Sequence, residues 1–422
     1  MPDTGLMLDA PRTAPVTAGE VVVIGLGYVG RPIALEAAAA GFAVTGFDLD
    51  PAAARGAEAA SHGLERAGRF RATTDPRALP RAETWLICVP TPLDAAGTPD
   101  LSLVLAALDT CRAGLAPGAL VCLVSTCQPG ATNGLCRREL ERDGLVVGHD
   151  IFLAVSPERE NPGGGAPGPR HMPRLLGAPD PASMARARAF WDRIAETIVP
   201  VASPEIAECA KLLENTYRLV NIALIDELHR GFTALGVPTR AVVAAAATKP
   251  FGFAPFWPGA GAGGHCIPVD PEFLQMELAR AGAASTLLAA AAEANRARPA
   301  RIVAAVERAL GGALAGRRVL VLGVTYKPDV PDLRGAAPVA LLRAVAARGA
   351  EAMWHDPVLG AAPPVLDGLR RIEDPARCGA EVVILGTAHR AYDPACIAAL
   401  APHVIDPHGL LPPDPTGRVR VV

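Results

Sequence analysis

The sequence has few aromatic residues and almost no net charge. Phe, Trp and Tyr make up 4% of the 422 residues, and 40 Lys and Arg against 43 Asp and Glu leave a formal net charge of −3. So little charge provides no attraction for nucleic acid or an anionic membrane, and neither is expected as a partner. The 50% of hydrophobic residues exclude wholesale disorder and indicate packed cores.

Long hydrophobic runs and paired cysteines are also missing. Every apolar run meets a charge or a proline before the roughly 18 residues that a membrane-spanning helix needs. Residues 1–18 carry acids and prolines where a secretory signal needs a basic start and an apolar core, so a flexible leader is expected there. The nine cysteines form no CxxC pair. They therefore argue against a disulfide scaffold or a metal site and favour a cytoplasmic location.

The remaining sequence divides into three blocks. Residues 19–203 alternate β-rich runs such as EVVVIG, TWLICV and ALVCLVS with Ala-rich stretches, which predicts an α/β domain with a parallel sheet. Residues 204–300 contain a long helical pattern that can begin at Pro204 and end at Gly231. Residues 301–422 return to strand and helix alternation and predict a second, smaller α/β domain.

A glycine pattern follows the first predicted strand. Gly25, Gly27 and Gly30 form a GxGxxG turn that opens a helix, and Asp48 ends the next strand about 20 residues later. This context predicts a dinucleotide site that prefers NAD, because a carboxylate there accepts the ribose hydroxyl and repels a 2′-phosphate. The alternatives are a plain glycine turn with a capping Asp, or NADP beside Arg55. The third block lacks such a pattern, so its ligand is expected to be something other than a dinucleotide.

Polar residues follow several predicted strands of the first block. Ligands of parallel sheets collect at the carboxyl ends of strands, where Thr126 and Glu158 would face the cofactor. Ordinary turn chemistry explains them equally well. On the long helix, Lys211, Asn215 and Arg218 share one face, which suits proton relay or oxyanion stabilisation. The alternative there is a solvated face, with Glu205, Glu208 and Glu214 in surface pairs.

The loop GAGAGGHCIPVDP contains the most suggestive cysteine. Its glycines let backbone N–H groups converge on an anion, and Asp270 lies four residues after Cys266. Cys266 is therefore a candidate nucleophile, although a lone cysteine is more often structural. His265 is interpreted as a positioning or substrate contact and not as a general base, because adjacent side chains commonly diverge.

Several motifs in order resemble the UDP-glucose/GDP-mannose dehydrogenase family of nucleotide-sugar 6-dehydrogenases. They are GLGYVGRPIA, CVPTPLD, STCQPG, SPERENPG, AKLLENTYRLVNIALIDEL, KPFGF, PGAGAGGHCIPVDP, GVTYKPDVPDLR and VIDPHG. The GGHCIPVDP form is similar to the branch that acts on UDP-N-acetylhexosamines. The chain departs from the family at Asn133, where Glu is common, at His408, where Arg is usual, and in the residues after Arg334. These departures leave open which sugar and which nucleotide the protein binds.

The resemblance implies two hydride transfers to NAD, a thiohemiacetal and thioester on Cys266, and a homodimer formed through the central helices. Lys211 would act as acid/base and, when charged, stabilise the alkoxide oxygen at C6. Asn215 would donate to that oxygen, and Asp270 would assist Lys211 or a water. Thr126 and Glu158 would position the hydrolytic water. The remaining cofactor contacts would be Gly25, Gly27, Tyr28, Val29, Gly30, Asp48, Pro90, Thr91 and Thr126. The substrate contacts would be Glu158, Arg159, Lys211, Asn215, Arg218, Phe256, Gly263, His265, Lys327 and Arg334. The domains would then be an NAD-binding domain at 19–203, a central helical domain at 204–300 and a nucleotide-sugar-binding domain at 301–422.

Two other functions remain compatible with the sequence. One is a two-electron NAD dehydrogenase of the hydroxyacid or 6-phosphogluconate type, or one acting on a related nucleotide or nucleoside alcohol, which would not need Cys266. The other is a non-catalytic sensor of NAD or a nucleotide sugar. The sugar epimer, the base and the pathway served, such as cell-surface polysaccharide synthesis, are not specified by the sequence.

Overall fold

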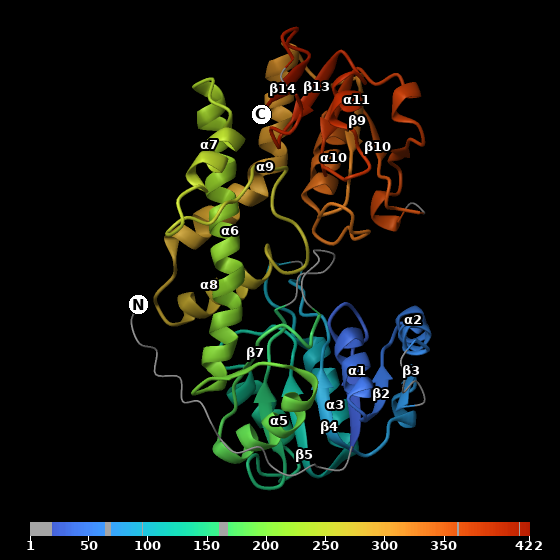
Figure 1. Cartoon of the computed structure of the whole chain (residues 1–422), viewed down its shortest axis with the longest axis vertical. Coiled ribbons are helices and arrows are strands. Elements are labelled where there is room, and N and C mark those ends of the chain that lie inside the picture. The colour runs from blue at the N-terminus through green and yellow to red at the C-terminus, as the bar shows by residue number, and fades with distance from the viewer. Residues whose placement is uncertain (1–18, 64–68, 95, 160–167, 361–362, 413) are drawn as a thin grey trace. The chain divides into compact units, whose positions relative to one another are not determined.

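The computed structural model describes the chain except for residues 1–18, 64–68, 95, 160–167, 361–362 and 413 (Figure 1). The predicted leader at 1–18 and part of the SPERENPG motif therefore lie outside the described residues. The chain forms two compact units: Met1–Thr91 with Asp100–Lys211, and Pro92–Pro99 with Leu212–Val422. The boundary falls inside helix α6. The domain limits expected from the sequence stay a prediction.

The first unit contains a six-stranded parallel sheet in the order β3-β2-β1-β4-β5-β6. Its strands are β1 (Glu20–Ile24), β2 (Ala43–Phe47), β3 (Phe70–Thr73), β4 (Ala82–Ile87), β5 (Leu115–Leu123) and β6 (Phe152–Val155). Its helices are α1 (Gly30–Ala39), α2 (Pro51–Ser61), α3 (Ser102–Gly114), α4 (Arg137–Leu140) and α5 (Pro181–Ile194), with the short turns η2 (Pro76–Ala78) and η3 (Thr132–Cys136). The small strands β7 (Arg174–Leu176) and β8 (Ile198–Pro200) pair separately.

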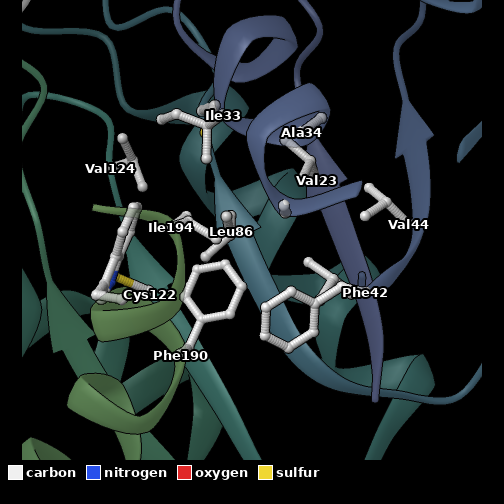
Figure 2. Packing of buried hydrophobic residues seen from close by; sticks show 14 of the residues in the cluster. Val23, Ile33, Ala34, Phe42, Val44, Leu86, Cys122, Val124, Phe190 and Ile194 are labelled. Carbon is white, nitrogen blue, oxygen red and sulfur yellow. The ribbon is translucent and has the colours of Figure 1, made fainter. Parts of the chain in front are cut away.

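Both faces of this sheet are buried, as the strand sequences predict. Successive side chains of a strand point to opposite faces. Val23 of β1 therefore joins a core with Ile33 of α1 and Phe190 of α5, which Figure 2 shows. On the other face, Val22 packs in a core with Leu108 of α3. Helices on both faces leave the carboxyl ends of the strands as the place for ligands.

The second unit contains the larger part of α6 (Pro204–Ala234), followed by α7 (Thr239–Ala246), α8 (Asp270–Arg280) and α9 (Thr286–Leu310). Pro204 opens α6 as expected, but the helix continues through Gly231 for another three residues. The expected end at Gly231 is therefore wrong, because a lone glycine weakens a helix without requiring it to stop. Among the described residues no helix has both the length and the hydrophobicity to cross a membrane.

A second six-stranded parallel sheet follows in the order β11-β10-β9-β12-β13-β14, the same order as the first. Its strands are β9 (Arg318–Leu322), β10 (Glu351–His355), β11 (Arg370–Arg371), β12 (Val382–Leu385), β13 (His403–Asp406) and β14 (Val419–Val421). Its helices are α10 (Ala337–Ala347) and α11 (Pro394–Ala398), with the short turns η4 (Pro364–Leu366) and η5 (Pro375–Arg377). The α/β, helical, α/β fold expected from the sequence is thus confirmed.

Candidate functional site

The glycine turn after β1 has the shape that a dinucleotide requires. Gly25 has a φ of +91°, and a Cβ atom there would lie 2.5 Å from the Cys88 carbonyl oxygen. A Cβ at Gly30 would lie 1.8 Å from the Gly25 carbonyl oxygen, so both glycines are required by the packing of strand and helix. Gly27 has open space around its Cβ position. This open glycine fits the close approach of a pyrophosphate to the start of α1.

Asp48 lies directly after β2 and beside this turn. Its carboxylate accepts the Leu26 N–H at 2.7 Å and the Asp50 N–H at 2.9 Å. These two bonds fix the carboxylate next to the glycine turn while its side chain stays partly exposed. Tyr28 in the same turn is 43% exposed. The residues present therefore fit the adenosine half of NAD.

The loops after β4 and β5 are joined by a hydroxyl. Ser125 donates to the carbonyl oxygens of Ile87 at 3.2 Å and Val89 at 2.7 Å. This contact holds the segment with Pro90 and Thr91, of which Thr91 is buried and Pro90 exposed, beside the half-buried Thr126. Because all strands are parallel, these residues share the ligand edge of the sheet with Gly25.

Glu158 sits in a buried ion pair that the sequence does not reveal. Its carboxylate accepts from the Arg174 guanidinium at 2.9 Å and from the Arg159 N–H at 2.8 Å. The Arg174 side chain is itself 3% exposed and stacks over the Trp191 ring at 4.3 Å. No motif marks Arg174, because it enters from β7, a small strand that sequence patterns do not predict.

The first two turns of α6 are anchored in the first unit by acids. Glu208 is 3% exposed, and its carboxylate accepts the N–H groups of Gly130 and Thr132 at 2.6 and 2.9 Å. Glu205 accepts from the Asn133 amide at 2.6 Å. The expectation of ordinary surface pairing is therefore wrong for Glu208, since helix η3 covers it. Burial raises the pKa of Glu208, and hydrogen bonds from Thr132 oppose that rise.

Lys211 and Asn215 are also buried, at 7% and 5% exposure, so the alternative of a solvated helix face is wrong for both. Arg218, one turn further along the same face, is exposed. Asn215 donates its amide to the Asp270 carboxylate at 2.5 Å. The Asp270 N–H in turn donates to the Cys266 carbonyl oxygen at 2.8 Å, where the loop enters α8. Within the second unit, the structure thus brings Asn215, Asp270 and the exposed Cys266 together.

The glycine loop around Cys266 packs against residues 326–336. The Gly264 N–H donates to the Arg334 carbonyl oxygen at 3.1 Å. A Cβ at Gly263 would come within 2.8 Å of the Gly335 carbonyl oxygen, and one at Gly264 within 3.0 Å of the Tyr326 ring. These glycines are therefore needed so that two backbones can touch, which places the loop with Cys266 beside the YKPDVPDLR segment.

Polar groups converge around this contact. Nε2 of His265 is buried and has no hydrogen-bond partner among the described residues. Burial, and then the charge of Arg334, lower the pKa of His265, so its ring is neutral at pH 7. Burial, and then the charge of Arg218, lower the pKa of Lys327. Arg334 itself pairs with Asp332 at 2.7 Å. Arg334 thus lies near His265, and Arg218 lies near Lys327, while the contact of the glycine loop with residues 326–336 brings His265 and Lys327 into one neighbourhood.

Two further contacts support this neighbourhood. The half-buried Phe256 meets the Tyr217 ring edge-on, with the centroids 5.9 Å apart. Asn295 of α9 accepts the Ala262 N–H at 2.7 Å and donates to the Ala262 carbonyl oxygen at 3.0 Å. Sequence reasoning missed Asn295, because a lone amide in an Ala-rich helix carries no signal of the loop that it holds.

A buried aspartate and a histidine pair at the carboxyl ends of the strands of the second sheet. Asp356 follows β10 as Asp48 follows β2, and it accepts the Val324 N–H at 2.7 Å. The His389 ring lies 3.0 Å from the same carboxylate, and its side chain is fully buried. The expectation that this sheet binds something other than a dinucleotide stays a prediction.

Comparisons with known proteins agree with both units. Residues 19–195, 205–297 and 320–412 match the profiles described as the NAD binding domain, the central domain and the UDP binding domain of the UDP-glucose/GDP-mannose dehydrogenase family. A UDP-N-acetyl-D-glucosamine 6-dehydrogenase of Pseudomonas aeruginosa is 32% identical over 88% of this chain and 91% of its own length. A UDP-N-acetyl-D-mannosamine dehydrogenase of Salmonella typhi is 30% identical over 88% and 94%.

Among solved structures, a UDP-D-ManNAc dehydrogenase from Pyrococcus horikoshii is similar over 95% of this chain and 98% of its own. Its TM-score is 0.83 and its sequence identity is 26%.

Proposed function

Because this chain belongs to the UDP-glucose/GDP-mannose dehydrogenase family, we propose that it oxidises C6 of a UDP-N-acetylhexosamine to the carboxylic acid through a thioester on Cys266. The chain is an NAD-dependent nucleotide-sugar 6-dehydrogenase. The N-acetylhexosamine is supported by the names of the relatives and by the GGHCIPVDP loop. The observation that carries the proposal is the packing of the loop with Cys266 against residues 326–336.

The second unit supplies the groups that bind the nucleotide sugar. Lys327 and Arg334 are the cations suited to a diphosphate. His265, with its buried unpartnered Nε2, offers one hydrogen bond to the sugar. Arg218 and Phe256 border the same neighbourhood, and Gly263 lets the loop approach without a side chain. Arg159 and Glu158 remain substrate contacts on the resemblance alone.

The first unit holds the cofactor. Gly25, Gly27 and Gly30 cradle the pyrophosphate, Tyr28 and Val29 border it, and Asp48 binds the adenosine ribose. Pro90, Thr91 and Thr126 line the same edge of the sheet. Bound NAD supplies the hydride acceptor for both oxidations.

The covalent chemistry belongs to the second unit and to the adjoining turn of α6. Lys211 takes the hydroxyl proton as the alcohol loses hydride, and the Cys266 thiolate then adds to the C6 aldehyde. Loss of a second hydride converts the thiohemiacetal to a thioester. Water attacks the thioester carbon, and the C–S bond breaks to return the thiolate and the carboxylate. One alcohol and one water thus release two hydrides and three protons.

The other polar groups assist these steps. Asn215 donates to the oxygen that becomes negatively charged, and its bond to Asp270 fixes the direction of its amide. Asp270 also exchanges protons with Lys211 or a water. Thr126 and Glu158 position the hydrolytic water. The Arg174 guanidinium holds the Glu158 carboxylate in its orientation.

We also propose that two copies pair through α6. Five large apolar side chains on this helix are 40% to 62% exposed, and we call them the α6 stripe: Ile206, Leu213, Tyr217, Leu224 and Leu228. Their spacing alternates between seven and four residues, which places all of them on one face of the 31-residue helix. A self-complementary stripe of this kind suits a two-fold symmetric contact.

The thioester mechanism is tested by counting NADH. The wild-type protein should form two NADH for each sugar acid. Cys266→Ser should stop before the acid and lose at least about a thousandfold of the acid-forming rate, because a serine hydroxyl is a poorer nucleophile without a base. Cys396→Ser, which changes an exposed cysteine of the C-terminal domain, is the matched control and should keep the wild-type rate.

A two-electron dehydrogenase would instead give one NADH with a released aldehyde, and Cys266→Ser would retain most of its turnover. A sensor would bind NAD without turnover of any nucleotide sugar.

A panel of UDP- and GDP-sugars assayed for NADH identifies the substrate. Faster oxidation of UDP-glucose than of every UDP-N-acetylhexosamine would contradict the proposed sugar and leave the thiol chemistry standing.

A further inference from the structure

A cavity of about 420 Å³ lies in the second unit between α6, α9 and the C-terminal strand β14. None of the residues that line it belongs to the proposed catalytic, NAD or nucleotide-sugar site. Its volume falls in the range of pockets that hold small organic ligands. We call it the arginine pocket, after the five arginines in its lining: Arg230, Arg298, Arg301, Arg308 and Arg420.

The charge of this pocket is unbalanced. The acidic side chains in its lining are Asp226 and Glu227, and Val422 at the end of the sequence also lines it, so the five arginines outnumber the acidic groups. Glu227 pairs with Arg230 at 3.8 Å. The guanidinium groups of Arg301 and Arg308 make no hydrogen bond or ion pair with any residue that the structure describes. They are seven residues apart on α9 and therefore lie on the same face.

The arginines repel one another. Burial lowers the pKa of Arg298, Asp226 opposes this effect, and the nearby charges of Arg301 and Arg230 lower the pKa further. A bound anion would remove this repulsion, and guanidinium groups match phosphate oxygens in geometry as well as in charge.

Apart from Thr233, the side chains in the rest of the lining are apolar. Alanines of α6 and α9 form much of the wall: Ala223, Ala234, Ala294, Ala304, Ala305 and Ala309. Such small side chains leave room for an apolar body beside the guanidinium groups. We propose that the arginine pocket binds a small phosphorylated molecule, with its phosphate on Arg301 and Arg308 and its apolar part against the alanine wall.

Two residues of the lining, Arg298 and Asp226, also hold the backbone of a neighbouring loop. A test of the pocket therefore leaves both unchanged. Arg298 donates to the Gly259 carbonyl oxygen at 3.0 Å, and Asp226 accepts the Gly259 N–H at 2.9 Å. Gly259 precedes the loop with Cys266, so substitutions of Arg298 or Asp226 would disturb catalysis and stability together. Arg301 and Arg308 have no such contacts and can be changed without loss of a hydrogen bond within the described chain.

The experiment follows phenyl phosphate and inorganic phosphate by phosphorus NMR titration of the full-length protein. Phenyl phosphate should bind at least about tenfold more tightly than phosphate, because only its ring can contact the alanine wall. The double substitution Arg301→Gln and Arg308→Gln should weaken binding of both probes by at least about tenfold. Lys327→Gln, which changes a cation of the nucleotide-sugar site, is the control and should leave both affinities unchanged.

Each of the following results would overturn the proposal. Equal affinity for the two probes would remove the role of the alanine wall. Wild-type affinity in the double variant, or loss of binding in Lys327→Gln, would place the anion elsewhere. Absence of binding to the wild-type protein would exclude the site directly. If wild type binds neither probe while the double variant alone dissociates in sedimentation velocity, the pocket is covered by a second copy of the chain.

Discussion

At the residue scale, the site depends on buried ionisable groups. Burial of a charge costs free energy, and a neighbouring hydrogen-bond or ion-pair partner offsets that cost. A buried carboxylate without a partner would protonate or destabilise the fold. Glu158 has Arg174, and Asp356 has His389. The Cys122 thiol, in contrast, has a pKa raised to about 12 by burial, which makes it inert. Cys266, unlike Cys122, is exposed.

His229 on α6 offers a test of this balance by pH. Its side chain is 1% exposed, its Nδ1 bonds the Thr239 hydroxyl at 2.7 Å, and Arg298, Asp406 and His408 are the charges that face it. Burial, and then the charge of Arg298, lower its pKa from 6.5 to about 4. Since folding favours the neutral ring, its stabilising effect is complete above pH 6.5 and is lost as the pH falls toward 4.

The unfolding free energy of wild type should fall between pH about 7 and about 4. In His229→Gln this fall should be smaller, by at most about 3 kcal/mol. Asp226 acts in the opposite direction, because burial raises its pKa to about 6, but it is present in both proteins and cancels in the comparison. Urea unfolding at each pH measures the difference. His62→Gln, which changes an exposed histidine, should match wild type, and an unchanged slope in His229→Gln would contradict the assignment.

At the scale of elements, α6 combines three separate roles along its length. Its first turns are fixed by Glu208 to the backbone at Gly130 and Thr132. Its middle presents Lys211 and Asn215 in buried positions. Its outer face carries the α6 stripe. A helix of 31 residues spans about 46 Å, long enough to hold catalytic groups and a pairing surface on different faces.

Leu224→Glu should convert the proposed dimer to a monomer. A two-fold contact would place two added carboxylates in an apolar surface, which should weaken dimerisation by at least about a hundredfold. Sedimentation equilibrium measures the change. Leu105→Glu on α3, where the leucine is 37% exposed and outside the α6 stripe, is the matched control and should leave the mass unchanged. A monomeric wild type, or a variant with unaltered affinity, would refute pairing through α6.

At the scale of the whole molecule, two sheets of the same strand order perform different tasks. In each sheet an aspartate follows the second strand and accepts an N–H from the turn after the first. The difference lies in what surrounds the carboxylate. Asp48 stays partly exposed, whereas Asp356 is buried against His389. The same topology thus places one carboxylate partly in solvent and buries the other beside a histidine.

Matched substitutions of these two aspartates should separate binding from stability. Asp48→Asn should weaken NAD binding about tenfold and reduce the preference for NAD over NADP, because it removes the charge beside the ribose. Asp356→Asn should leave the NAD affinity unchanged and lower the unfolding free energy by about 1–3 kcal/mol, because His389 loses its partner. Calorimetric titration and urea unfolding measure the two effects, and weaker NAD binding in Asp356→Asn would contradict this division.

The sequence by itself determined the α/β, helical, α/β order, the glycine turn with Asp48, and the candidate cysteine loop. These features depend on local patterns, since alternation, glycine spacing and helical periodicity are all written within a few residues of one another. Sequence could not show that α6 passes Gly231, that Glu208 is buried, or that small strands β7 and β8 exist.

Only the tertiary structure decided which polar groups lost water and which partners they gained. Arg174 reaches Glu158 across 16 positions, Asp270 reaches Asn215 across 55, and Asn295 reaches Ala262 across 33. Such contacts depend on how distant elements pack. Burial changes the pKa of a side chain and its need for hydrogen-bond partners, although its position in the sequence pattern stays the same. The arginine pocket is of the same kind, because α6, α9 and β14 enclose it only when the chain has folded.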